Sequence, residues 1–126
     1  MATSIKFAGV TVPQSRVFYQ RSHVFAMVLH NQICEGHILL APFQSDKNFR
    51  DLSNPQSFEL VLAIKELSQL VKSVDADVQG ASVVVQEFGF GGTSMNHLRV
   101  HIVPRRGRDS RSNAQIEEAL QSFSNT

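Results

Sequence analysis

The feature that most constrains the fold is one long amphipathic helix pattern in the middle of the chain. After Asn54 and Pro55, apolar side chains recur at i, i+3, i+4 and i+7, with polar side chains mostly on the opposite side. Asn is a favoured N-cap, and Pro at the first helical position loses no needed N–H, so a helix is predicted over about residues 55–74. Its apolar stripe comprises Leu60, Ala63, Ile64, Leu67, Leu70, Val71 and Val74. Such a stripe has to be buried against a second layer.

That second layer is predicted to be a sheet. Short runs rich in β-branched, aromatic and aliphatic residues cover residues 16–20, 23–30, 36–43, 81–87 and 97–103. Pro104 is expected to end the last of these strands, because proline cannot donate to a ladder. Ser112 and Gln115 form a capping box that predicts a C-terminal helix with Ile116, Leu120 and Phe123 as its stripe. The order strands, helix, strands, helix with short connections predicts an α+β fold with an antiparallel sheet.

Length and composition limit the class of protein. A chain of 126 residues is long enough for one apolar core, which predicts a single domain over residues 1–126. The single cysteine, Cys34, cannot form an internal disulfide, which favours a cytoplasmic compartment. No apolar run approaches the roughly 20 residues of a membrane span, so no membrane partner is expected. The N-terminus is free of acidic residues up to Glu35, which leaves mitochondrial targeting as an alternative.

Residues 97–102 alternate polar and apolar side chains. On a strand, His97, Arg99 and His101 share one face, while Leu98, Val100 and Ile102 occupy the other. Residues four apart on a strand are separated by roughly 13 Å. The two histidines therefore lie too far apart to bind one ion, and a guanidinium between them would repel it. Neither a metal nor a cofactor is expected.

A Gly-rich segment, FGFGGTS, precedes this strand. It matches neither the dinucleotide fingerprint nor the P-loop, because the glycine spacing is wrong and no Gly-Lys-Ser/Thr follows. It is either a plain hairpin loop or a flexible backbone whose N–H groups approach an anion, with Thr93 and Ser94 adding hydroxyl donors. Convergence of these groups with Gln86 and the polar strand face would form an anion pocket, most economically one for phosphate.

The segment HLRVHIVPRR resembles the His-x-His-x-His-x-x motif of the histidine triad (HIT) superfamily. The -PR ending and the flanking sequence are most similar to its fragile histidine triad (Fhit) branch, along almost the whole chain. The resemblance implies a five-stranded antiparallel sheet with one long helix, and pairing of two chains as a homodimer or as a heterodimer with a HIT homologue. It also implies a nucleotide or dinucleoside polyphosphate as ligand. In the family's enzymes the middle histidine attacks the α-phosphorus and forms a nucleotidyl-histidine.

Position by position, the resemblance assigns His97 and His101 to the first and third triad histidines. It assigns His37 and Gln86 to substrate binding, beside Thr93, Ser94 and Arg99. Arg99 stands at the nucleophile position. A guanidinium stays protonated and has no lone pair for attack, but it can hold a phosphate through two parallel hydrogen bonds. The sequence therefore predicts a nucleotide-binding protein with impaired hydrolysis.

Two alternatives remain open at this stage. The first is an active nucleotidyl hydrolase or transferase that uses water directly, with His97 or His101 as the general base. The second is a non-enzymatic interaction or RNA-binding subunit, because clustered arginines supply phosphate affinity that does not depend on sequence. That cluster consists of Arg105, Arg106, Arg108 and Arg111.

Overall fold

A computed structural model describes residues 4–29, 31–45, 47–88 and 97–121. The elements are β1 (Ser4–Phe7), β2 (Val10–Pro13), a 3-10 turn (Gln14–Arg16), β3 (Val17–Gln20), β4 (Val24–Val28), β5 (Ile38–Pro42), a second 3-10 turn (Phe49–Asp51), α1 (Asn54–Val74), β6 (Val78–Gln86), β7 (Arg99–Arg106) and α2 (Asn113–Gln121). A five-stranded antiparallel sheet has the order β3-β4-β5-β7-β6. The predicted α+β fold is confirmed.

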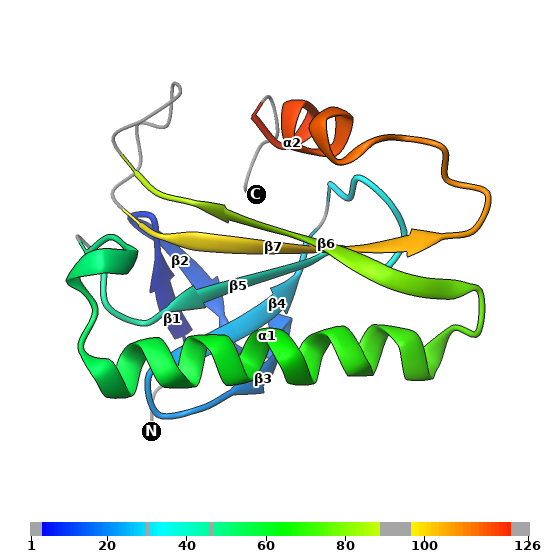
Figure 1. The fold of residues 1–126 in the computed structure, drawn as a ribbon. Coiled ribbons are helices and arrows are strands. Elements are labelled where there is room, and N and C mark those ends of the chain that lie inside the picture. Colours follow the sequence, from blue (N-terminus) through cyan, green and yellow to red (C-terminus); the bar gives the residue numbers. More distant parts are fainter. Residues whose placement is uncertain (1–3, 30, 46, 89–96, 122–126) are drawn as a thin grey trace.

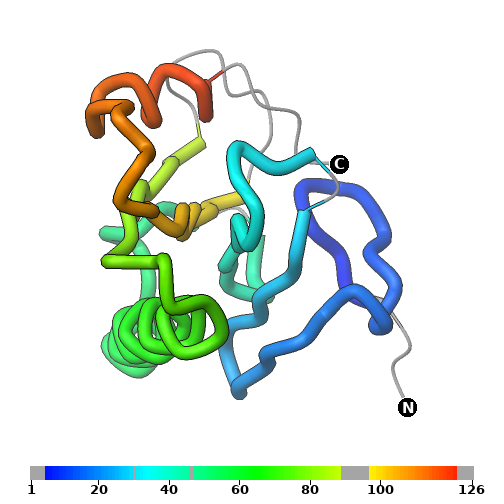
Figure 2. The backbone as a smooth tube through the Cα atoms, turned by 90° about the vertical axis from the view of Figure 1, so that its right-hand side faces the viewer, coloured from blue at the N-terminus to red at the C-terminus, as the bar shows by residue number. Residues whose placement is uncertain are grey.

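The elements form layers around this sheet (Figure 1). Helix α1 runs along one face and α2 lies over the other. Figure 2 shows the N-terminal β1–β2 hairpin beside the sheet, apart from both helices. The core under α1 consists of Val24, Ala26, Ile38, Leu40, Leu52, Leu60, Ala63, Leu67, Val71, Val78, Leu98, Val100 and Ile102. Neither helix in the described part of the chain is long and apolar enough to cross a bilayer.

The start of α1 differs by one residue from the prediction. Ser53, not Asn54, is the N-cap: its hydroxyl accepts from the Gln56 N–H, and the Gln56 side chain accepts from the Ser53 N–H. A capping box needs Glu or Gln three residues after the cap. Gln56 satisfies that rule for Ser53, whereas Ser57 fails it for Asn54. Pro55 is still accommodated in the first turn.

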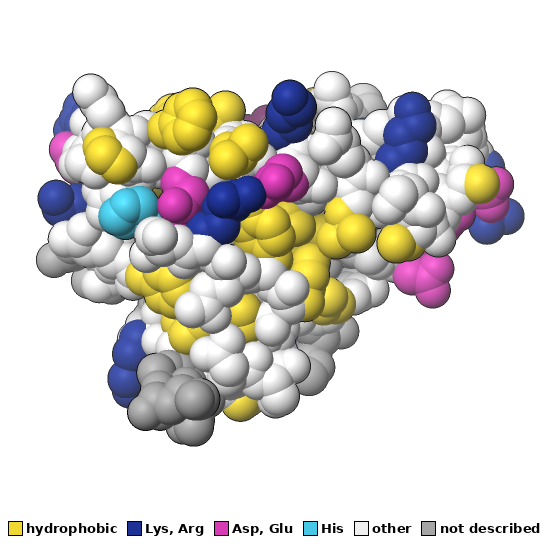
Figure 3. Space-filling model, turned by 90° about the horizontal axis from the view of Figure 1, so that it is seen from below, with side chains coloured by type: hydrophobic (Ala, Val, Ile, Leu, Met, Phe, Trp, Pro, Cys, Tyr) yellow, Lys and Arg dark blue, Asp and Glu magenta, His cyan; other side chains and the backbone are white. Residues whose placement is uncertain are grey.

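The predicted apolar stripe of α1 is correct in its centre and wrong at two positions. Leu60, Ala63, Leu67 and Val71 are buried and Ile64 is partly buried. Leu70 is 40% exposed and Val74 is 74% exposed. Leu70 lies at the margin of the stripe, and Val74 is the last residue of the helix. Figure 3 views the molecule from the α1 side and shows apolar side chains between charged ones there.

Strand β7 continues past Pro104, which the sequence predicted would end it. The strand runs to Arg106, and Pro104 pairs with Ala81 of β6. The pairing of β5 with β7 ends at Ile38 and Ile102, so beyond Ile102 only β6 is a ladder partner. The Pro104 carbonyl accepts from the Cys34 thiol, on the side away from β6. Because N and O of one residue point the same way in an antiparallel strand, the missing N–H removes no ladder bond.

The N-terminal hairpin was not resolved by the sequence pattern. Strands β1 and β2 form a separate two-stranded sheet joined by Ala8 and Gly9, both with positive φ (52° and 79°). Two such residues make the tight turn that suits hairpin twist. The hairpin packs on the sheet through Ile5, Phe7, Val12, Phe25, Met27, Leu29, Leu39 and Ala41.

The C-terminal helix follows the prediction. Ser112 and Gln115 form the expected capping box, with the Gln115 N–H donating to the Ser112 hydroxyl and the Ser112 N–H donating to the Gln115 side chain. Ile116 and Leu120 are buried against Val103. Phe123 lies outside the described residues.

Candidate functional site

The two faces of β7 separate as the alternation predicts. Leu98, Val100 and Ile102 belong to the core under α1. His97, Arg99 and His101 are buried on the opposite side, at 1%, 2% and 0% exposure. The ladder register sets their neighbours: His101 lies between Leu39 of β5 and Val84 of β6, and Gln86 lies opposite Arg99. Gln86 is therefore a diagonal neighbour of His101.

A directed hydrogen-bond chain runs through two of the buried histidines, His37 and His101. The Ile33 N–H donates to His37 Nδ1 (3.2 Å), so His37 carries its proton on Nε2. His37 Nε2 lies 2.9 Å from His101 Nδ1 and donates to it, which places the His101 proton on Nε2. That nitrogen donates to Gln86 Oε1 over 3.1 Å. One backbone amide thus fixes the tautomer of both rings. We call this hydrogen-bond chain, formed by Ile33, His37, His101 and Gln86, the histidine relay.

Burial keeps the relay neutral. Desolvation lowers the pKa of His37 to about 4. Desolvation also lowers the pKa of His101 to about 3, with further lowering by the charges of His37 and Arg99. The hydrogen bonds agree with these directions, because each ring accepts at Nδ1 and a second proton there would face a donor. Near pH 7 both imidazoles are uncharged.

His97 stands in a second cluster. Its Nδ1 accepts from the Ala8 N–H over 2.9 Å, and its Nε2 donates to the Pro42 carbonyl over 2.7 Å. The Phe7 ring lies 4.6 Å from the imidazole, centroid to centroid. Burial lowers the pKa of His97, partly opposed by the bond to Pro42, so this ring is neutral as well. His97 therefore joins the hairpin tip to the end of β5.

Arg99 lies between the relay and the hairpin. Its Nε and Nη2 donate to the His97 carbonyl at 3.2 and 3.1 Å. Its guanidinium carbon is 5.4 Å from the centroid of the Phe7 ring, in a cation–π arrangement. Burial lowers the pKa of the guanidinium below its usual value, although an arginine retains its charge at neutral pH.

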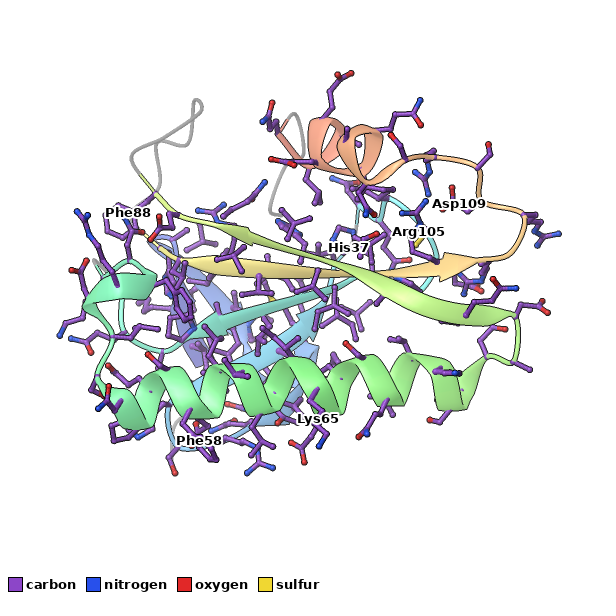
Figure 4. All side chains as sticks on the ribbon, in the orientation of Figure 1. His37, Phe58, Lys65, Phe88, Arg105 and Asp109 are labelled. Carbon is purple, nitrogen blue, oxygen red and sulfur yellow. The ribbon has the colours of Figure 1, made fainter. Side chains whose placement is uncertain are left out.

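The structure divides the predicted site into these two clusters. His37, Gln86 and His101 come together, and Arg99 contacts His97. Figure 4 shows His37 on the α2 side of the sheet, inside the molecule. Thr93 and Ser94 lie outside the described residues. Sequence reasoning missed the backbone groups of Ala8, Ile33 and Pro42, for which periodicity gives no signal; the turn-forming Gly9 was the only hint of the first.

The arginine cluster at and after the end of β7 is largely bonded within the chain. Arg105 donates to Ser82 Oγ (2.8 Å), Arg106 to Asp75 Oδ2 (2.8 Å), and Arg111 to both carboxylate oxygens of Asp109. Arg105 and Asp109 lie close together in Figure 4. The side chain of Arg108 is exposed.

The sequence model of the HIT domain matches residues 10–108, so the chain belongs to the HIT domain family. It is 27% identical over 105 residues to the nitrilase and fragile histidine triad fusion protein NitFhit of Caenorhabditis elegans, covering 83% of this chain and 24% of that protein. It is 25% identical over 119 residues to a bis(5′-adenosyl)-triphosphatase of Dictyostelium discoideum, covering 94% of this chain and 79% of that protein.

A solved structure agrees with these sequence relatives. The crystal structure of C. elegans NitFhit superimposes with a TM-score of 0.78 at 29% identity, over 95% of this chain and 29% of that chain. The chain thus spans about a quarter of the fusion protein. Its relatives include fragile histidine triad and bis(5′-adenosyl)-triphosphatase proteins at low identity.

Proposed function

We propose that this protein is a single HIT domain over residues 1–126 that binds a nucleotide or dinucleoside polyphosphate and hydrolyses it poorly or not at all. The ligand class is suggested by relatives named as bis(5′-adenosyl)-triphosphatases. The impairment follows from Arg99 at the nucleophile position. A guanidinium has no lone pair with which to attack phosphorus.

One observation carries the proposed impairment: both flanking imidazoles direct their lone pairs toward donors of the same chain. His97 Nδ1 accepts from Ala8, and His101 Nδ1 accepts from His37. Neither ring takes over the role of the missing nucleophile in this arrangement. The same bonds oppose the alternative in which His97 or His101 acts as a general base toward water, because a base needs an available lone pair.

Arg99 supplies the positive charge of the proposed phosphate site. The His101 Nε2–H, the Gln86 side chain and the Arg99 fork lie on one face of β6 and β7. Thr93 and Ser94 belong to the proposed ligand set by position in the sequence. Phosphate binding requires the Nε and Nη2 donors of Arg99 to turn from the His97 carbonyl toward the ligand.

The protein is also proposed to pair with a second HIT chain through β6. This strand is an edge of the sheet, and edges with unpaired backbone groups are templates for another strand. Val83 and Val85 on this edge are 41% and 43% exposed. The arginine cluster gives less support to a nucleic-acid partner, because Arg105, Arg106 and Arg111 already bond to groups of the same chain.

The test is hydrolysis of diadenosine triphosphate by the wild type, by Arg99→His and by Arg108→His. The third protein is a matched control, because it adds a histidine at an exposed arginine outside the site. We expect Arg99→His to hydrolyse the substrate at least ~10³-fold faster than the wild type and Arg108→His. Losing a nucleophile costs on the order of 10⁶ in rate in other covalent enzymes. AMP binding, measured by calorimetry, should be present in all three.

Equal turnover by the wild type and Arg99→His would contradict the impairment and favour direct attack by water. Absence of AMP binding in the wild type would contradict the nucleotide site itself. A salt titration of RNA binding addresses the remaining alternative, because contacts to several phosphates weaken steeply with salt.

A further inference from the structure

The turn that carries His37 is fastened by residues from distant parts of the chain. It lies between β4 and β5, and Gly36 in it has φ of +90°, a conformation that favours glycine. The His37 N–H donates to the Cys34 carbonyl over 3.2 Å, and the Cys34 thiol donates to the Pro104 carbonyl over 3.2 Å. Residues 33–36 of the turn, all in the described part of the chain, have no regular strand or helix hydrogen bonds, so these individual hydrogen bonds determine the shape of the turn.

Arg106 attaches this turn to two other elements through charge-assisted hydrogen bonds. Its Nε and Nη2 donate to Asp75 Oδ2 at 3.1 and 2.8 Å, and its Nη1 donates to the Glu35 carbonyl at 3.0 Å. One planar guanidinium thus joins the end of β7, the end of α1 and the turn before β5. Such a fork fixes direction as well as distance, which a single ammonium does not.

Arg111 supports the same turn from α2's side. Its Nη1 lies 3.5 Å from the Ile33 carbonyl, and its other nitrogens hold Asp109 at 2.9 and 2.8 Å. The two arginines therefore contact the carbonyls at both ends of the segment from Ile33 to Glu35. The charge of each is balanced by a carboxylate, Asp75 or Asp109, so neither brings an uncompensated charge close to the relay.

The turn matters because its first amide sets the direction of the histidine relay. The Ile33 N–H is the donor that leaves His37 Nδ1 unprotonated. If the turn shifts, this donor moves away and His37 can carry its proton on either nitrogen. His101 and Gln86 would then lose their single arrangement, because each accepts from the preceding ring.

We infer that Arg106, held by Asp75, is a positioning residue that fixes the tautomers of His37 and His101 through the turn at residues 33–36. Its relevance to ligand binding rests on the proposed nucleotide site. The inference assigns to this arginine a structural role in the site, in place of the nucleic-acid contact that its cluster suggested.

The experiment is NMR of the imidazole nitrogens at pH 7 in the wild type, Arg106→Gln, Asp75→Asn and the matched control Arg108→Gln. In the wild type, His37 and His101 should each show a protonated Nε2 and an unprotonated Nδ1. Arg106→Gln should move the His37 signals toward a mixture of tautomers, and Asp75→Asn should do so to a smaller extent. Arg108→Gln should leave them unchanged.

Unchanged tautomers in folded Arg106→Gln would overturn the inference, as would an equal change in Arg108→Gln, which would point to a general charge effect. If Arg106→Gln does not fold, Arg106→Lys replaces it, since it keeps the charge but not the planar fork.

AMP affinity separates the two proposals. A weakening of about tenfold in Arg106→Gln is expected, because a relay without a single arrangement would lose the one charge-assisted hydrogen bond that the His101 Nε2–H offers to the phosphate. Absence of AMP binding in the wild type, with the tautomer change intact, would remove the nucleotide site and leave the positioning role.

Discussion

The two faces of β7 are equally buried but are stabilised differently. On the α1 side, Leu98, Val100 and Ile102 need only close packing, because apolar side chains have no hydrogen bonds to satisfy. On the other side, His97, Arg99 and His101 have partners drawn from the hairpin, β5, β6 and the turn before β5. A buried polar group without a partner costs ~1–3 kcal/mol, so the polar face tolerates little change in its surroundings.

This difference supports the proposal that the polar face carries the functional site. A strand that needed only stability would place apolar residues on both faces, as buried strands commonly do. Here three adjacent positions on one face retain ionisable side chains at 2% exposure or less. The following predictions test the contrast between the faces.

The largest expected effect is on the apolar face. Ile102→Ala should lower the free energy of unfolding by about 2–5 kcal/mol, because it leaves a cavity under α1 in a close-packed core. Chemical denaturation measures this change. Ile102→Leu is the control and should cost less than about 1.5 kcal/mol, since it conserves volume. Equal losses for both would mean that shape, not volume, decides packing here.

The second prediction concerns pH. Burial depresses the pKa of His37, His97 and His101, so below about pH 6.5 the unfolded chain binds protons that the folded chain does not. Stability is therefore full above pH 6.5 and falls as the pH drops toward 4, by at most about 1.4 kcal/mol per pH unit for each histidine. Denaturation between pH 7 and 5 measures the slope. A flat profile would show that these rings take up protons in the folded protein as readily as in the unfolded chain, so that burial does not depress their pKa.

On the polar face, His101→Leu should lower the free energy of unfolding by about 1–3 kcal/mol although it adds apolar surface. The His37 Nε2–H would lose its acceptor in a buried site, whereas Gln86 is only half-buried and can turn to water. Denaturation midpoints give the change. An increase in stability would mean that the hydrogen-bonded relay is no more stable than an apolar core.

The smallest effect is expected at the hairpin tip. Phe7→Leu removes the aromatic ring beside His97 and Arg99, a contribution of about 0.5–2 kcal/mol. Because the hairpin is a separate two-stranded sheet, the loss should appear locally, as faster hydrogen exchange of the Ala8 amide. Val10→Ala on the exposed side of the hairpin is the control and should leave that exchange unchanged. Unchanged exchange in Phe7→Leu would show that the ring does not hold the tip.

Much of the fold followed from local rules. The period of the apolar residues identified α1, and the alternation in residues 97–102 assigned both faces of β7. The error at Asn54 is local, because the sequence spacing already pairs Gln56 with Ser53 in a capping box. The errors at Leu70, Val74 and Pro104 depend on what lies beside each residue and not on the residue itself. Pro104, for example, is tolerated because β5 has already diverged from β7.

The sequence by itself determined that one strand carries His97, Arg99 and His101 on one face, and that the middle position has no nucleophilic lone pair. These follow from the two-residue period of a strand and from the chemistry of the side chain. Only the tertiary structure decided the state of those groups. Ala8 and Pro42 reach His97 across 89 and 55 residues, and Ile33 sets the relay through a turn held by Arg106. Strand register and turn geometry place these backbone partners, and the local periodicity of the sequence predicts neither of them.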